Sequence, residues 1–247
     1  MSTNNTGLKL GQPNISGMLK PNEAVKQFFT GSFFPVAQHL FQILPDATFV
    51  FTILFSILTQ NFALGTLALT LIEAMLAFTL FGTGVNYFMD SKSPQIPEAC
   101  QAGFPTSVSS YSTLSIFSGF SQEGPFPSYP IALVSTLIGY VLTALFQYTA
   151  ELKQLGNGWE LRVPIATTLS FLVLTAFVLF RYIAGCENLG VITGTLVIGL
   201  LLGTLLTFQN LTFLGKESVN VLGIPILESK TIGGKPLYVC AKAESQS

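Results

Sequence analysis

The chain has 247 residues, a net charge of −1 and only 9% charged residues against 49% hydrophobic ones. Soluble domains carry roughly 25% charged residues, so the shortage of charge excludes an ordinary soluble enzyme and a disordered chain. The chain also lacks the basic surface of a nucleic-acid binder, and we expect no nucleic-acid partner. Uncharged apolar runs of about 18 residues or more are typical of membrane spans. The sequence therefore predicts an integral membrane protein whose first partner is the lipid bilayer.

The N-terminal region, residues 1–44, combines a polar arm with an amphipathic segment. Residues 1–20 are polar and lack the apolar core of a cleavable signal, which predicts a flexible arm. The segment that follows has apolar residues at helical spacing. Such a helix either lies in the headgroup plane or packs on the protein's own membrane domain. The residues that share this face are Val36, Leu40, Ile43 and Leu44.

The next region, residues 45–88, is apolar and too long for one crossing. Pro45 and Asp46 predict a helix start there, with Asp46 as the N-cap. The 42 residues from 47 to 88 contain one charged side chain, Glu73. As one straight helix they would be roughly 63 Å long, whereas the hydrocarbon core is about 30 Å thick. The region either folds back near Gln60–Asn61 or runs well beyond the bilayer.

Three more spans are predicted within residues 130–210, at 131–151, 163–184 and 189–210. The predicted fold is thus an all-α integral membrane protein. It is a bundle of four to five transmembrane helices with an amphipathic N-terminal segment and a short β-prone C-terminal tail.

Two long segments are predicted to lie outside the membrane. Residues 89–129 are rich in proline, serine and aromatic residues, which is typical of a small folded surface element or an interaction segment. Residues 211–247 contain two β-prone stretches, beginning with 219–227, on either side of Gly233–Gly234. We expect other proteins to bind these two segments.

Lysines and arginines bear on the number of crossings. If residues 45–88 cross once, nine basic residues share one side and two lie on the other, whereas two crossings give five against six. Because basic residues favour the cytoplasmic side, the count favours four crossings plus a short inserted arm, with both termini cytoplasmic. The length of the apolar region favours five crossings.

The cysteines limit the chemistry. With either number of crossings Cys100 and Cys186 lie on one side, and Cys240 lies on the other. If the first side is luminal or external, Cys100 and Cys186 can form a disulfide; otherwise they are two free thiols. Three cysteines without close spacing and one histidine, His39, make no metal signature. We expect no metal, no cofactor and no enzyme activity.

The last predicted span contains two GxxxG pairs, which permit close approach between helices. They are Gly190 with Gly194 and Gly199 with Gly203. The two pairs face opposite sides of the helix. The helix is therefore predicted to lie between two neighbours. The second neighbour belongs either to the same chain or to another copy in a homo-oligomer, unless the pattern arises by chance, since GxxxG is common in apolar helices.

Glu73 is the one acidic residue deep in a predicted span. Acidic groups inside a bilayer cost several kcal/mol and are often functional. Glu73 either serves a small ion channel or transporter, or is protonated and hydrogen-bonded to a hydroxyl that locks two helices together. The candidate polar partners are Thr70, Tyr140, Thr143 and Gln147.

Two stretches carry a family resemblance: LPDATFVFTILFSILTQNFALGTLALTLIEAML and NLTFLGKESVNVLGIPILESKTIGGKPLYVCA. They resemble multi-span virion membrane proteins and minor capsid proteins of large icosahedral double-stranded DNA viruses. The resemblance implies a structural scaffold that links the lipid bilayer to a protein shell. It also implies a place in the virion internal membrane and in host endomembranes during assembly, and it implies no catalytic residues.

Overall fold

A computed structural model describes several parts of the chain. The chain divides into two compact units, Met1–Leu40 and Phe41–Ser247. In the first unit the described residues, 34–40, are the first turns of one helix. All packing described below lies within the second unit. The described residues are 34–89, 100, 102–105, 113–114, 126–154, 161–223, 231–232 and 235–236.

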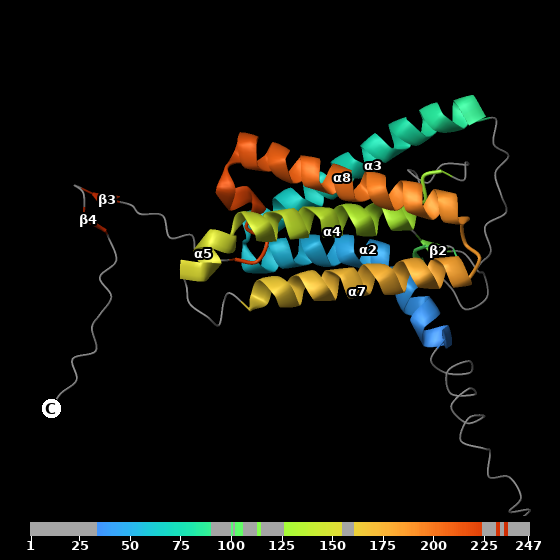
Figure 1. The fold of residues 1–247 in the computed structure, drawn as a ribbon, viewed down its shortest axis with the longest axis horizontal. Coiled ribbons are helices and arrows are strands. Elements are labelled where there is room, and N and C mark those ends of the chain that lie inside the picture. The colour runs from blue at the N-terminus through green and yellow to red at the C-terminus, as the bar shows by residue number, and fades with distance from the viewer. Residues whose placement is uncertain are drawn as a thin grey trace, which may run out of the picture. The chain divides into compact units, whose positions relative to one another are not determined.

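Five helices among the described residues are long and apolar enough to cross a membrane (Figure 1). They are α2 (Phe34–Thr59), α3 (Phe62–Met89), α4 (Tyr129–Gln147), α7 (Arg162–Ile183) and α8 (Leu189–Leu214). The predicted class, an all-α integral membrane protein, is therefore confirmed. The shorter elements are α5 (Thr149–Gln154), the 3₁₀ helix η4 (Lys216–Val219) and the two-residue strands β1 (Phe104–Pro105), β2 (Thr113–Leu114), β3 (Thr231–Ile232) and β4 (Lys235–Pro236).

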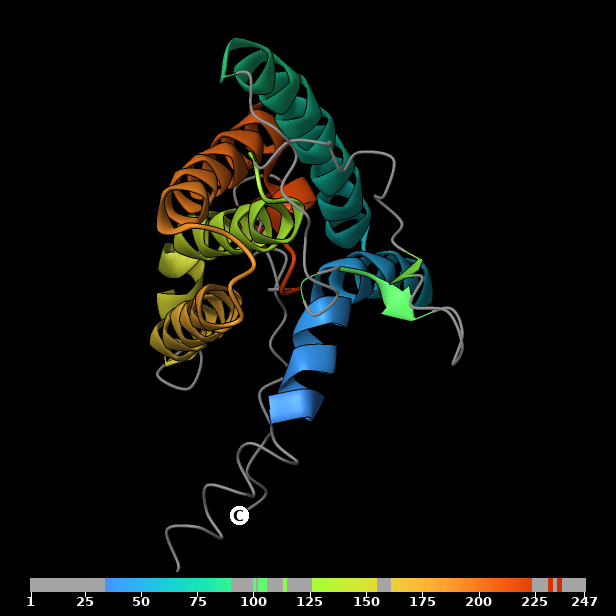
Figure 2. The same cartoon turned by 90° about the vertical axis from the view of Figure 1, so that its right-hand side faces the viewer.

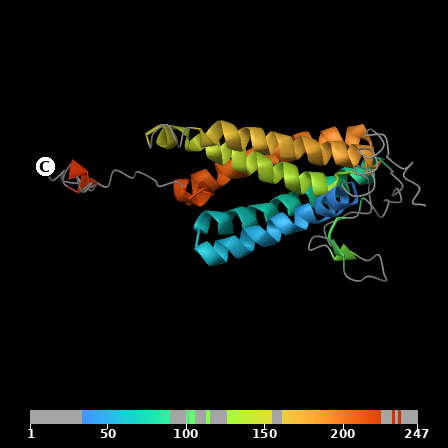
Figure 3. The ribbon, with the colours of Figure 1, turned by 90° about the horizontal axis from the view of Figure 1, so that it is seen from below.

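Helix α4 is the centre of the second unit. It contacts α3, α7 and α8, and the end-on view shows it between α7 and α8, with α3 on a further side (Figure 2). In its most apolar window 72% of the residues are buried, against 17% in α7. Successive long helices run in opposite directions (Figures 1 and 3). Helices α7 and α8 leave most of their apolar side chains for lipid, whereas α4 is shielded by protein.

The predicted helix start at Pro45 is wrong. Helix α2 continues through Pro45, although proline inside a helix loses a backbone hydrogen bond at a cost of about 3 kcal/mol. Asp46 is not an N-cap; it is fully buried and accepts a hydrogen bond of 2.5 Å from the Tyr129 hydroxyl. The N-cap rule is local, and here a contact with another helix overrides it.

Burial of the preceding turn favours the continued helix. Phe41 and Leu44 pack against an apolar cluster of α4, α7 and α8 residues. The Phe41 ring centroid lies 5.0 Å from that of Phe180 and 5.8 Å from that of Phe177. From Phe41 onward, the amphipathic segment therefore packs on the protein's own membrane domain. Val36 is 68% exposed.

The predicted turn at Gln60–Asn61 is confirmed. Gln60 has φ 52°, and the Asn61 side chain caps α3 by accepting a hydrogen bond of 2.9 Å from the Ala63 amide. The apolar region therefore folds back into α2 and α3. The structure has five candidate spans, where the charge count favoured four.

The tail differs from the prediction at its start. Of the stretch 219–227 that was predicted as a strand, the described part, 219–223, is not a strand: Val219 ends η4 and is fully buried in the main apolar cluster. The β3 and β4 strands pair antiparallel on either side of Gly233–Gly234, where the turn was predicted. In the 89–129 segment, β1 pairs antiparallel with β2.

Glycines bring α4 and α8 into close contact. A Cβ atom on Gly203 would lie 2.2 Å from the Thr136 carbonyl oxygen, and one on Gly139 of α4 would lie 2.6 Å from the Leu200 carbonyl oxygen. Such distances are impossible for real carbon atoms, so the two backbones touch where only hydrogen atoms fit. This approach is the use that the GxxxG pattern predicts.

The glycine contact gives a direct stability prediction. Gly203→Ala should lower the free energy of unfolding in detergent by at least about 1–3 kcal/mol, because the added methyl group meets helix backbone that cannot rotate away. Thermal unfolding followed by circular dichroism measures the loss. The matched control is Gly84→Ala in α3, where a Cβ meets nothing within 4 Å. Equal stability of the two variants would contradict the close contact.

Candidate functional site

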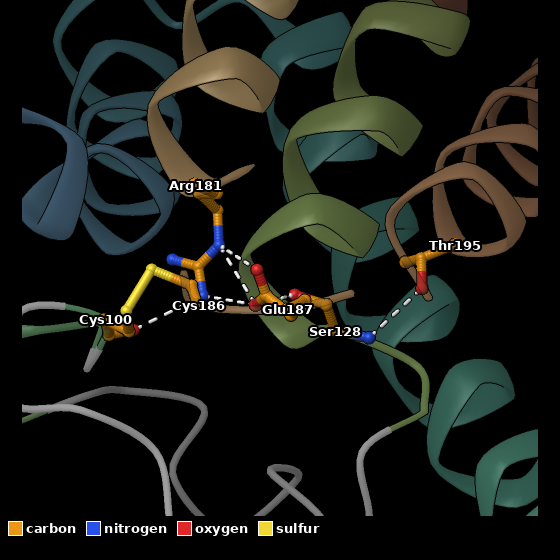
Figure 4. Close-up of polar contacts among 6 residues, drawn as sticks. All are labelled: Cys100, Ser128, Arg181, Cys186, Glu187 and Thr195. Carbon is orange, nitrogen blue, oxygen red and sulfur yellow. Dashed lines mark hydrogen bonds and ion pairs between the residues drawn. A yellow bond between two sulfur atoms is a disulfide. The ribbon is translucent and has the colours of Figure 1, made fainter. Parts of the chain in front are cut away.

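A disulfide and a buried ion pair meet at the end of the bundle where α7 ends and α8 begins (Figure 4). The disulfide joins Cys100 to Cys186, with Cα atoms 5.3 Å apart. Beside it, Arg181 is only 3% exposed and forms a two-pronged ion pair with Glu187. Arg181 Nε donates to both carboxylate oxygens of Glu187, at 3.0 and 2.9 Å. The guanidinium group also donates to the Cys100 carbonyl oxygen at 3.3 Å.

Ser128, which precedes α4, extends this network to a third helix. Its hydroxyl donates to Glu187 at 2.6 Å, and its backbone amide donates to the Thr195 hydroxyl of α8 at 3.1 Å. The short connection between α7 and α8 is thus attached to α4 and to the segment that contains Cys100. We call this network the clamp. Its residues are Cys100, Ser128, Arg181, Cys186, Glu187 and Thr195.

Additional bonds attach α2 and α3 at the same end. The Asn86 side chain of α3 donates to the Phe126 carbonyl oxygen at 2.9 Å, and the Gly103 amide donates to the Gln42 carbonyl oxygen of α2 at 3.0 Å. The Tyr129–Asp46 hydrogen bond joins α4 to α2. All five long helices are therefore held together at this end by polar groups.

The contacts of the clamp offset the free-energy cost of burying two charged groups. A buried arginine or glutamate without a partner costs several kcal/mol, and only excellent geometry with additional hydrogen bonds offsets the loss of water. Here the guanidinium group has a bidentate partner and a carbonyl, and Glu187 also accepts the Ser128 hydroxyl. Because the charged groups of Arg181 and Glu187 face one another, they bind each other and connect segments of the same chain.

A second polar cluster lies between α3, α4 and α8. The buried Asn210 side chain donates to the Thr70 hydroxyl at 2.7 Å and to the Tyr140 hydroxyl at 3.2 Å. Thr207 of α8 donates to the Tyr140 carbonyl oxygen at 3.3 Å. Hydrogen bonds between spanning helices are typically worth about 0.6 kcal/mol each, so the cluster adds modest stability and fixes which faces meet.

Glu73 lies on the exposed side of α3, outside this cluster. It accepts a hydrogen bond of 2.9 Å from the Gln209 carboxamide of α8. Three of the four residues expected around it have other partners: Thr70 and Tyr140 bond to Asn210, and Thr143 bonds to Thr204. Glu73 does link two helices, but through an amide instead of a hydroxyl.

The structure separates the four predicted packing glycines. Gly199 and Gly203 lie against α4, and a Cβ on Gly199 would lie 1.8 Å from the Ser135 hydroxyl oxygen. A Cβ on Gly194 would lie 3.2 Å from the Phe126 ring, and Gly190 is exposed. The described residues place one pair between helices of the same chain, and contact with a second copy stays a prediction.

Sequence reasoning missed the partners that make the clamp. Arg181 and Glu187 lie on either side of Cys186 in RYIAGCENL, and this pair of opposite charges next to a candidate disulfide was the available signal. Asn210 and Gln209 carried no comparable signal, because α8 contains several polar residues that look alike in sequence. Cys240 lies outside the described residues.

No protein-family model, curated protein or solved structure matches this chain. Within the described ranges, no group of three or more histidine, cysteine, aspartate or glutamate side chains is placed to hold a metal ion. The fold and its polar contacts define the class of the protein: an all-α integral membrane protein whose described spans are clamped at one end.

The disulfide should contribute measurably to stability. Replacing both Cys100 and Cys186 by serine should lower the free energy of unfolding by about 2–4 kcal/mol, because the unfolded chain has more conformational entropy without the bridge. Chemical unfolding of the detergent-solubilised protein, followed by tyrosine fluorescence, measures the difference. Cys240→Ser is the matched control. If the control and the double variant unfold at the same denaturant concentration, the bridge does not hold the bundle.

Proposed function

We propose that this protein is a structural membrane scaffold, specifically a virion membrane or membrane-anchored minor capsid protein that links the bilayer to a protein shell. The observation that supports the proposal is that polar side chains in the bundle bond to neighbouring segments of the same chain. Arg181, Glu187, Asn210 and Tyr140 each bond to another helix or to the segment before one. Such groups make the bundle rigid, which is what an anchor requires.

The segments outside the spans supply contact surfaces for partners. Residues 89–129 are attached to the bundle through Cys100 and Gly103, so a load on this segment is transmitted to the helices. At the other end of α8, Ser218 and Val219 of η4 are buried against the bundle, and residues 224–247 follow η4 in the sequence. The resemblance of two stretches to virion proteins supports the shell as the partner.

The tail deletion that tests this proposal should spare η4, because Val219 belongs to the apolar core. Removing residues 224–247 should leave the spans inserted but reduce incorporation of the protein into purified particles at least tenfold. A tenfold reduction corresponds to a loss of roughly 1.4 kcal/mol of binding free energy. Quantitative immunoblotting of particle and membrane fractions measures this ratio. Glu73→Gln is the control and should be incorporated normally.

Two outcomes would argue against the scaffold. One is normal incorporation of the 224–247 deletion. The other is ion flux through proteoliposomes that disappears in Glu73→Gln but persists in Ile72→Ala, which is the behaviour of a small channel or transporter. The scaffold predicts no such flux, because the Glu73 carboxylate lies on the outside of α3 and bonds to Gln209.

A further inference from the structure

We infer that the chain is inserted with its clamp end on the exoplasmic side and the end of α8 that leads to the C-terminal tail on the cytoplasmic side. The inference does not depend on the proposed function. It rests on the direction of the helices and on the disulfide.

The direction of the helices divides the described connections between two faces. The clamp end contains the end of α3, the start of α4 and the connection between α7 and α8 (Figure 1). The opposite end contains the Gln60–Asn61 turn, α5, the start of α7 and η4. Because each long helix is a candidate span, these two ends face different compartments.

The disulfide assigns the clamp end to an oxidising compartment. Its formation converts the thiols of Cys100 and Cys186 into one Sγ–Sγ bond, and two electrons and two protons pass to the disulfide of an oxidoreductase, which becomes a dithiol. Exoplasmic compartments such as the endoplasmic reticulum lumen or the periplasm support this exchange, whereas the cytosol keeps thiols reduced.

Basic residues are divided almost evenly between the two sides and do not decide the orientation. At the end opposite the clamp, Lys153, Arg162 and Lys216 lie at or beside helix ends. At the clamp end the basic residue of the described helices is Arg181, and its charge is neutralised by Glu187. By sequence, Lys92 follows α3 on the clamp side, and Lys9, Lys20 and Lys26 precede α2 on the same side. Over the whole sequence five basic residues lie on the clamp side and six on the other, so the disulfide is the observation that assigns the orientation.

This orientation differs from the expectation that both termini are cytoplasmic. It puts residues 89–129 and the tail in different compartments, so they cannot bind the same partner surface. If the scaffold proposal also holds, a cytoplasmic shell would contact the tail, and the 89–129 segment would face the lumen.

Two single-cysteine reporters test the orientation in the full chain, with Cys100 and Cys186 retained and Cys240→Ser as background. Glu217→Cys reports on the η4 end, and Tyr87→Cys, at a position 83% exposed, reports on the clamp end. The proteins are synthesised into sealed vesicles of endoplasmic reticulum and treated with a membrane-impermeant maleimide that carries a mass tag. Non-reducing alkylation first verifies that the Cys100–Cys186 bridge has formed.

We expect the Glu217→Cys protein to shift completely on a gel in sealed vesicles, and the Tyr87→Cys protein to shift only after detergent opens them. The reverse pattern would overturn the orientation. Equal labelling of the two reporters in sealed vesicles would overturn the five-span arrangement on which it rests. Absence of the Cys100–Cys186 bridge in these vesicles would overturn the assignment of the clamp to the oxidising side.

Discussion

The buried ion pair between Arg181 and Glu187 is the contact on which the order of this bundle depends. Protein excludes water from Arg181, which is only 3% exposed, so its charge needs a partner within the chain. Arg181 and Glu187 belong to the end of α7 and the turn before α8, and their remaining hydrogen-bonding capacity is used by Ser128 and the Cys100 carbonyl. One interaction therefore determines how three segments, distant in sequence, meet.

The contact between α4 and α8 complements the clamp along the length of the bundle. Apolar side chains gain little from packing against one another when the alternative is lipid, so close backbone contact and specific hydrogen bonds decide the arrangement. Gly139, Gly199 and Gly203 permit the contact, and Asn210 with Tyr140 determines which faces of the helices meet. The disulfide then connects this bundle to the 89–129 segment, so a partner bound outside the membrane would be held by the helices inside it.

The spans could be predicted because they depend on composition: long uncharged runs have few alternatives to a membrane helix. The Gln60–Asn61 turn was predictable for a similar reason, since a largely apolar stretch of 42 residues is too long for one crossing of the bilayer. Asp46 was misjudged because the sequence around it fits an N-cap, while its real partner, Tyr129, is 83 residues away. Asn210 and Gln209 could not be singled out, since only the packing of α3 against α8 distinguishes them from the other polar residues of these helices.

A double-mutant cycle on the ion pair tests most directly whether the polar groups of the spans hold the helices together. Arg181→Met, Glu187→Gln and the double variant would be compared by unfolding free energy in lipid bicelles, with the disulfide intact. Each single variant should have a free energy of unfolding about 3–5 kcal/mol lower, because the remaining member of the pair stays buried without its charged partner. The double variant should lose less than the sum, with a coupling energy of about 0.5–3 kcal/mol. Losses that add without coupling would contradict a bundle clamped by this pair.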